Sequence, residues 1–276
     1  MELTPRYGSP PILTIDIDLG DVRIPSARQS TRLFDILSSL DEEAWSSPSR
    51  CAGWSVADVI THLDSTHGFW IASLAAGLAG EPSEYLAGFD PVATPPQIND
   101  SIGELEPAVL LERFHASTTG LASTAASIAD SQWPLLAETP VGHLPLDAML
   151  LHALWDAWIH ERDILLPLGI EATVESDEVA GILAYVAGLG PAFSLTMGES
   201  RRGSLGIDAT DPELSMQIEI TDTVSVQPGS GGSDALLSGD AVELVESLSC
   251  RSTMIETSRD DAWMLSGLRQ VFDQPA

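Results

Sequence analysis

Residues 144–166 form an apolar segment that carries a line of ionisable side chains. No glycine interrupts this segment and no proline follows Pro145 before Pro167, so it predicts a helix of about six turns. At about 100° per residue, one face of this helix holds Met149, His152, Asp156, His160 and Asp163. Nearly every other direction is apolar, which predicts a buried helix whose ionisable face points into the protein.

Buried imidazole and carboxylate groups need polar partners, and their spacing here leaves two interpretations open. Asp156 and His160, four residues apart, can give two ligands to one metal ion, and an imidazole from a neighbouring helix would complete a three-ligand site. Alternatively, the same pair is a hydrogen-bonded brace between helices. His152, one turn before Asp156, is a candidate acid or base or a support for the site; its structural alternative is a hydrogen bond within the helical core.

His62 is the candidate for the third ligand. Ser55 and Asp58 form the capping-box pattern S-x-x-D, which predicts a helix over residues 55–78. His62 lies two turns into this helix, at the edge of its apolar face. A lone histidine in such a place is most often a core residue, but a second helix that carries D-x-x-x-H favours a ligand.

The hydrophobic periodicity predicts a helical first part of the chain. Residues 26–44 and 107–128 also have helical spacing, and the proline-rich residues 80–106 are predicted to form a long loop. Four amphipathic helices with one long crossover are typical of a bundle. Residues 12–19 alternate between apolar and polar side chains and predict a strand, which pairs either with a C-terminal sheet or with a second copy of the chain.

After residue 168 the periodicity changes. Short alternating runs predict strands at residues 204–208, 215–221 and 223–227. Helical spacing predicts helices at residues 176–188, 239–248 and 260–271. Strands mixed with helices in this way indicate an α+β module.

The composition excludes some classes of partner. The formal net charge is −29, from 41 acidic residues against twelve arginines and no lysine. Such a surface repels phosphate backbones and anionic lipid headgroups, so we expect neither nucleic acid nor a membrane as a partner. No run of about 18 apolar residues predicts a membrane span, and the N-terminus lacks the pattern of a secretory signal, so we expect a cytoplasmic protein.

Two cysteines, Cys51 and Cys250, are far apart in the sequence and are expected to be free thiols. Neither belongs to a C-x-x-C pattern. Cys51 adjoins the Gly53–Trp54 pair near the candidate site, so it is either a catalytic thiol or a small packed residue.

Two stretches resemble a known family. The sequence WSSPSRCAGWSVADVITHL at residues 45–63, followed later by HALWDAWIHERDI at residues 152–164, resembles the N-terminal domain of mycothiol-dependent maleylpyruvate isomerases, which belong to the DinB-like/YfiT-like metalloenzyme superfamily. The resemblance implies a four-helix bundle that holds zinc or another divalent ion, with His62, Asp156 and His160 as ligands. The isomerase itself has glutamate where this chain has Asp156, which is one methylene shorter.

A third stretch extends this resemblance. SGDAVELVESLSCR, at residues 238–251, is similar to the sterol-carrier-like C-terminal domain of the same family. In that family an arginine of this domain helps to hold the anionic substrate or the thiol. The resemblance implies this role for Arg251, whose alternative is a surface salt bridge.

The patterns predict an α+β protein in three parts, residues 1–25, 26–168 and 169–276. The resemblance implies that these are an N-terminal extension, a DinB-like metal-binding four-helix bundle and a smaller sterol-carrier-like α+β domain. The resemblance implies a zinc-dependent enzyme that activates a low-molecular-weight thiol, with mycothiol as cosubstrate, for transfer to, or isomerisation of, a small electrophile. Two alternatives remain open: a hydrolase or natural-product tailoring enzyme that uses metal-activated water, and a non-catalytic protein that binds a small ligand. The expected partner is a small-molecule substrate, and the sequence leaves open whether the chain forms a homodimer.

Overall fold

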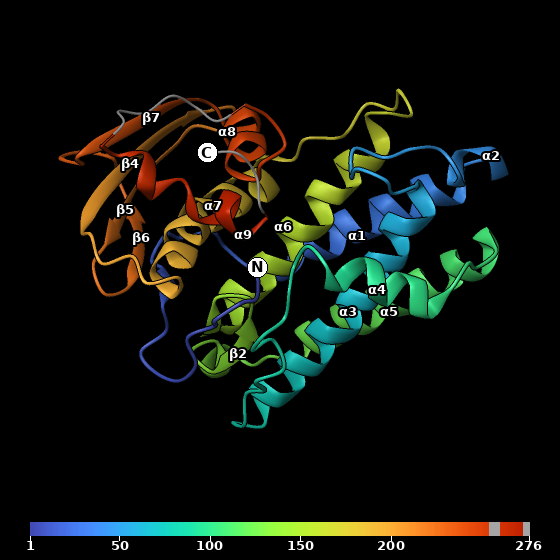
Figure 1. Cartoon of the computed structure of the whole chain (residues 1–276), viewed down its shortest axis with the longest axis horizontal. Coiled ribbons are helices and arrows are strands. Elements are labelled where there is room, and N and C mark those ends of the chain that lie inside the picture. The colour runs from blue at the N-terminus through green and yellow to red at the C-terminus, as the bar shows by residue number, and fades with distance from the viewer. Residues whose placement is uncertain (254–259, 273–276) are drawn as a thin grey trace.

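The computed structural model describes residues 1–253 and 260–272 of the chain. Its first part is dominated by four long helices, which pack against one another (Figure 1). They are α1 (Arg23–Ser38), α3 (Val56–Leu78), α5 (Pro107–Ala126) and α6 (Leu146–Leu165). These elements agree with the predicted helices at residues 26–44, 55–78, 107–128 and 144–166, except that the first is shorter than predicted.

Local chemistry explains where α3 begins and why α6 is central. The side chain of Ser55 accepts a hydrogen bond from the amide of Asp58, and the Asp58 carboxylate accepts one from the amide of Ser55, so the predicted capping box is confirmed. On α6, buried residues occupy nearly every direction around the helix axis. A helix of this kind is stable only when other elements surround it, and α6 contacts α1, α3 and α7.

The second part is a five-stranded sheet in the order β1-β6-β5-β4-β7. Its strands are β1 (Leu13–Ile15), β4 (Gly203–Thr210), β5 (Leu214–Ile220), β6 (Val224–Pro228) and β7 (Ala235–Asp240). The pairs β4–β5 and β5–β6 are antiparallel, while β1 lies parallel to β6 and β7 parallel to β4. The N-terminal strand therefore joins the C-terminal sheet of its own chain, although it is shorter than the predicted residues 12–19.

Helix α7 (Ser176–Thr196) lies between the sheet and the long helices (Figure 1). Its length and composition alone would suit a membrane-spanning helix, but 83% of its most apolar 18-residue stretch is buried inside the protein. It contacts β1, β5 and β6 on one side and α1 and α6 on another. It is the core helix that joins the two parts, and it extends beyond the predicted residues 176–188.

The C-terminal helices cover the same region. Asp240 caps α8 (Ala241–Leu248) by accepting hydrogen bonds from the amides of Val242 and Glu243. The prediction of one helix over residues 260–271 is wrong. The structure instead has a 3₁₀ turn, Ala262–Met264, followed by a separate short helix, α9 (Gly267–Val271).

Other differences from the sequence predictions have local causes. Residues 26–44 are not one helix, because α1 ends at Ser38 and Asp41 caps a separate short helix, α2 (Glu42–Trp45). The predicted loop at residues 80–106 contains α4 (Thr94–Ile102), whose first turn holds two prolines. Proline interrupts a helix interior but suits a first turn, because it has no N–H to satisfy there.

The hairpin β2 (Leu136–Thr139) and β3 (Gly142–Pro145) and the strand β7 were not predicted. The division into residues 1–25, 26–168 and 169–276 stays a proposal. Its main boundary falls in the turn between α6 and α7. Residues 254–259 and 273–276 of the proposed last part lie outside the described residues.

Candidate metal centre

The candidate site lies between α3 and α6, which pack side by side and run antiparallel. The rings of His62 and His160 are 5.0 Å apart, and one turn further along α3 the hydroxyl of Thr66 lies 3.4 Å from Oδ2 of Asp156. One more turn brings the ring of Trp70 to 4.7 Å from that of His152. The stripe predicted on α6 therefore faces a matching stripe on α3.

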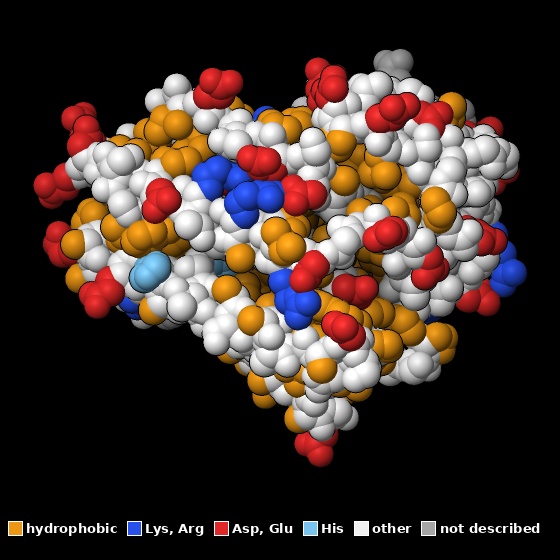
Figure 2. All heavy atoms as spheres, turned by 180° about the vertical axis from the view of Figure 1, so that it is seen from behind, with side chains coloured by type: hydrophobic (Ala, Val, Ile, Leu, Met, Phe, Trp, Pro, Cys, Tyr) orange, Lys and Arg blue, Asp and Glu red, His pale blue; other side chains and the backbone are white. Residues whose placement is uncertain are grey.

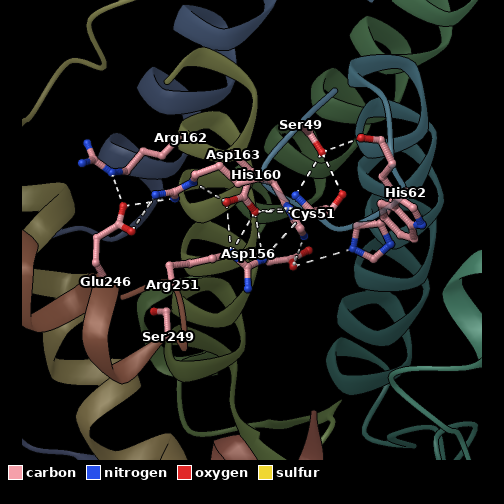
Figure 3. Close-up of polar contacts among 12 residues, drawn as sticks. Ser49, Cys51, His62, Asp156, His160, Arg162, Asp163, Glu246, Ser249 and Arg251 are labelled. Carbon is pink, nitrogen blue, oxygen red and sulfur yellow. Dashed lines mark hydrogen bonds and ion pairs between the residues drawn. The ribbon is translucent and has the colours of Figure 1, made fainter. Parts of the chain in front are cut away.

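The structure brings the three predicted ligands together (Figure 3). Nε2 of His160 lies 3.6 Å from Oδ1 of Asp156, and Nε2 of His62 lies 3.9 Å from the same oxygen. One ligand atom from each residue lies within 4.8 Å of the others. Three atoms that each lie about 2 Å from one tetrahedral ion are about 3.3 Å apart, so this donor set fits a zinc-sized ion after a small closure. The three side chains are between 10% and 16% exposed, which leaves the site an open side.

Asp163 supports the site from behind His160. Its Oδ2 lies 3.0 Å from Nδ1 of His160, which leaves Nε2 of that ring free to face Asp156. A carboxylate in this position fixes the orientation and the tautomer of a ligating histidine. In this position Asp163 can orient a ligating histidine.

Neighbouring histidine and arginine side chains favour the ionised form of both carboxylates. Burial raises the pKa of Asp156, but a stronger combined effect of His62, His160 and His152 places that pKa well below its usual range. Burial also raises the pKa of Asp163, and His160 and Arg251 together lower it far below its usual range. Both groups are therefore anionic at neutral pH and suited to bind cations.

Arg251 reaches the same carboxylate from the C-terminal part of the chain. It follows α8, and its guanidinium donates to both oxygens of Asp163 at 2.8–3.0 Å. Its side chain is 27% exposed, whereas that of Asp163 is fully buried. Arg251 thus forms a partly buried salt bridge with the carboxylate that also binds His160, and its role toward a substrate stays a prediction (Figure 3).

Sequence reasoning missed two members of this ionic cluster, Arg50 and Glu246. Arg50 donates to Oδ1 of Asp163 at 2.9 Å and also binds Glu246 of α8 at 2.8 Å. Arg162 binds the same glutamate at 2.6 Å and lies over the ring of Trp158. Figure 2 shows a face on which acidic side chains are widespread and basic ones gather in a few places. Three of the twelve arginines, Arg50, Arg162 and Arg251, therefore meet at two carboxylates, those of Asp163 and Glu246.

Cys51 packs against the same group. Its thiol lies 3.2 Å from Oδ2 of Asp163 and 3.6 Å from Nδ1 of His160. Burial and the Asp163 carboxylate raise the pKa of this thiol to about 12, which favours its protonated form. Cys51, His160 and Asp163 form a second group of potential metal ligands. Because two arginines already bind Asp163, the group of His62, Asp156 and His160 is the better candidate.

His152 lies deeper than the three ligands. Nδ1 of its ring is 2.5 Å from the hydroxyl of Tyr185 on α7, and only 5% of the residue is exposed. Burial lowers the pKa of His152 to about 4, so the ring is neutral at pH 7. The structure thus gives His152 a hydrogen bond within the core, and sequence reasoning missed its partner, Tyr185.

A separate groove of about 990 Å³ opens on another face of α3. Its walls come from α2, α3, α4 and α5, and none of the three candidate ligands lines it. The groove is therefore distinct from the candidate metal centre.

Comparisons with known proteins identify the family of the chain and proteins of similar fold. Residues 26–165 match the family described as "Mycothiol maleylpyruvate isomerase N-terminal domain". The chain also resembles a solved structure of the mycothiol-dependent maleylpyruvate isomerase, with a TM-score of 0.59 at 18% identity over 86% of this chain and 91% of that one. A mutant of that enzyme gives a TM-score of 0.59 at 17% identity over the same shares. At this identity the likeness is one of fold. No curated protein matches the sequence.

Proposed function

Because the chain belongs to the mycothiol-dependent maleylpyruvate isomerase family, we propose that it activates a low-molecular-weight thiol, mycothiol, for reaction with a small electrophile. Membership of this family makes the chain an enzyme of the thiol-dependent isomerase type. The observation that carries the proposal is the convergence of His62, Asp156 and His160 on one point, with their ligand atoms within 4.8 Å of one another.

These three residues would hold zinc or another divalent ion. Two neutral imidazoles and one carboxylate around a divalent cation leave a net positive site. When bound, the ion lowers the pKa of a coordinated thiol and keeps it as a thiolate at neutral pH. Asp163 orients His160 for this role, and Cys51 donates its thiol proton toward Asp163.

The protein supplies no nucleophile of its own at this point, because Cys51 is held as a thiol. An external thiol fits this arrangement. After the thiol has added to the electrophile, its elimination gives isomerisation, and retention of the new carbon–sulfur bond gives thiol transfer. We further place the enzyme in the cytoplasm, where such thiols are kept reduced.

Two residues are proposed to act on the substrate. Arg251 would offer its partly exposed guanidinium to an anionic group of the thiol or of the electrophile. His152 would act as a neutral imidazole, which donates a hydrogen bond but does not carry a charge. We propose both as catalytic residues of this reaction.

Elemental analysis of the purified protein tests the metal. We expect one divalent ion per chain, and loss of that ion in His62→Ala with unchanged helical content. An assay with maleylpyruvate as the first electrophile, run with and without mycothiol, tests the thiol. Turnover that needs the metal but no thiol would favour a hydrolase, and absence of metal would favour a protein that only binds a small ligand.

A further inference from the structure

Arg50 connects the candidate metal centre to the C-terminal part of the chain. Its Nε donates to Oδ1 of Asp163 at 2.9 Å, while its two Nη atoms donate to the two oxygens of Glu246 at 2.8 and 3.2 Å. Its backbone amide also donates to the carbonyl oxygen of Asp163, at 3.0 Å. A planar guanidinium that binds two carboxylates in this way has little freedom to turn. Arg50 therefore ties α6 to α8 in a fixed geometry.

Glu246 is the partner of this arginine on α8. Its carboxylate also binds Arg162 at 2.6 Å, and its carbonyl oxygen accepts a hydrogen bond from the backbone amide of Arg251 at 2.8 Å. The Glu246 side chain is 10% exposed, so water and salt screen its ion pairs only weakly. Among the described residues, Arg50 is the arginine whose side chain bonds both Glu246 and Asp163. A change in the Glu246 carboxylate therefore reaches Asp163 through Arg50.

The neighbours of Arg50 contact both histidines of the candidate centre. Asp163 lies 3.0 Å from Nδ1 of His160. On the other side, Arg50 belongs to the turn that precedes α3, and Trp54 of the same turn has its ring 5.4 Å from that of His62. Arg50 itself is not one of the candidate ligands, so any effect that it has on them passes through these neighbours.

We propose that Arg50 is a positioning residue of the metal centre. It fixes the Asp163 carboxylate and, through it, the ring of His160, while Glu246 of α8 fixes Arg50. The inference rests on the proposed function, and it adds the means by which the C-terminal part of the chain controls the geometry of the centre. Arg50 acts through Asp163 and does not touch the substrate in this role.

Loss of Arg50 should loosen His160 without emptying the site. In Arg50→Met, Asp163 keeps its ion pair with Arg251 at 2.8 Å, so the buried carboxylate stays compensated. It is then held from one side only, and the ring of His160 can turn with it. Groups that orient a ligating histidine typically change metal affinity by about 10–100-fold. We expect the lower end of this range, because Arg251 remains in place.

Competition for Zn²⁺ with a fluorescent chelator tests this effect. Arg50→Met should bind Zn²⁺ about tenfold more weakly than the unsubstituted protein. Arg162→Met is the matched control, because Arg162 also has a partly buried ion pair with Glu246 but its side chain points to that carboxylate and to Trp158. Its affinity for Zn²⁺ should stay within about twofold of the unsubstituted value. An equal loss of affinity in the two variants would overturn the role of Arg50.

A double variant separates positioning from a general loss of packing. Glu246→Gln should also weaken Zn²⁺ binding, since it removes the charge that fixes Arg50. If Glu246 acts through Arg50, the double variant Arg50→Met/Glu246→Gln should bind Zn²⁺ no more weakly than Arg50→Met alone. Two losses that multiply would mean that the residues act independently, and the proposed path from α8 to His160 would be wrong.

Nitrogen NMR of the histidine-labelled, metal-free protein tests the position of His160 directly. A carboxylate only accepts hydrogen bonds, so Nδ1 of His160 carries the proton that faces Asp163. The chain has six histidines, and His160→Gln assigns the signal. This N–H should exchange with water faster in Arg50→Met than in the unsubstituted protein or in Arg162→Met. An unchanged exchange rate would overturn the inference.

The two measurements also separate this inference from the proposed function. If the unsubstituted protein binds no divalent ion, the proposed function fails, and the exchange rate of the His160 proton alone decides the role of Arg50. Thermal unfolding checks that each variant is folded. If Arg50→Met is not, Arg50→Lys carries the test, because an ammonium group keeps the charge but lacks the planar fork that spans both carboxylates. Arg50→Lys should then show weaker Zn²⁺ binding and faster exchange, and unsubstituted values for both would overturn the inference.

Discussion

Asp156 lies between the two histidines of the candidate centre, so its removal should have the largest effect on metal binding. Its carboxylate is the group that both Nε2 atoms approach, at 3.6 and 3.9 Å. Asp156→Ala should therefore bind no ion, while circular dichroism shows unchanged helix content because the surrounding core is apolar. Asp64→Ala is the control, since Asp64 lies on the same helix as His62 but binds Arg113. Full metal occupancy in Asp156→Ala would show that this carboxylate is structural.

Arg251 should matter more for the Michaelis constant than for stability. In Arg251→Ala, Asp163 keeps its ion pair with Arg50 at 2.9 Å, so the buried carboxylate is not left alone. We expect the KM for thiol or electrophile to rise at least tenfold, because a partly exposed guanidinium that binds an anion is lost. Steady-state kinetics and thermal unfolding of the same preparation check this. Unchanged kinetics together with a large loss of stability would assign Arg251 a purely structural role.

Among individual residues, the sequence predicted the candidate ligands better than the side chains that hold them in place. His62, Asp156 and His160 follow helical spacing and a recognisable motif, and the structure brings their side chains together, although their role as ligands stays a prediction. Arg50 and Glu246 come from segments that are almost 200 residues apart, and no local pattern marks them as neighbours. Tyr185 lies in an apolar helix, where its hydroxyl gives no periodic signal.

Substitutions at two glycines can test how closely α7 and α9 pack. A Cβ atom added to Gly267 would lie 2.0 Å from the backbone oxygen of Gly190, whereas one added to Gly190 would meet no atom closer than 3.9 Å. Gly267→Ala should therefore lower the free energy of unfolding by about 2 kcal/mol or more, since backbone must move. Gly190→Ala should be tolerated. Equal denaturation midpoints for the two variants would show that α9 does not dock on α7 in this way.

A buried ionic group joins α1, α6 and α7. Arg32 of α1 binds Glu161 of α6 and Glu178 of α7, both at 2.8 Å, and each carboxylate is almost fully buried. Arg32→Met should cost about 3–5 kcal/mol, because it leaves two buried carboxylates with reduced compensation. The melting temperature should fall by roughly 10 °C. Arg202→Met, which breaks an exposed pair with Asp222, is the control and should leave the melting temperature nearly unchanged.

Elements with strong periodicity were predictable, and short elements were not. The capping box at Ser55 and the apolar circumference of α6 fix long helices from local information. The strand β7 pairs in parallel with β4, a register that depends on the rest of the sheet and not on its own sequence. The prolines in the first turn of α4 led to the prediction of a loop. Proline is common both in loops and in the first turn of a helix, so its presence alone does not distinguish the two.

For the whole molecule, buried histidine should make the fold sensitive to acid. Burial lowers the pKa of His67 to about 4, against about 6.5 in an unfolded chain. Between these two pKa values His67 is protonated in the unfolded state but not in the folded state. The contribution of His67 to the free energy of unfolding is therefore complete above pH 6.5 and is lost as the pH falls toward 4. Between pH 7.5 and 4.5 this amounts to roughly 2–3 kcal/mol.

His67→Gln removes this titration, so its melting temperature should fall less over the same pH range than that of the unsubstituted protein. The comparison cancels the effects of the other acidic and basic groups, which both proteins share. Parallel melting curves across the range would mean that His67 is protonated in the folded state.

The parallel pairing of β1 with β6 has a consequence for biosynthesis. Leu13 leaves the ribosome early, but its partner Val224 follows about two hundred residues later. Until then the apolar N-terminal strand has no sheet to join, and the helices between them can already assemble from nearer contacts. The edge position next to β6 can therefore be filled only after β6 has been made, when β1 joins a sheet formed by strands about two hundred residues further along the chain.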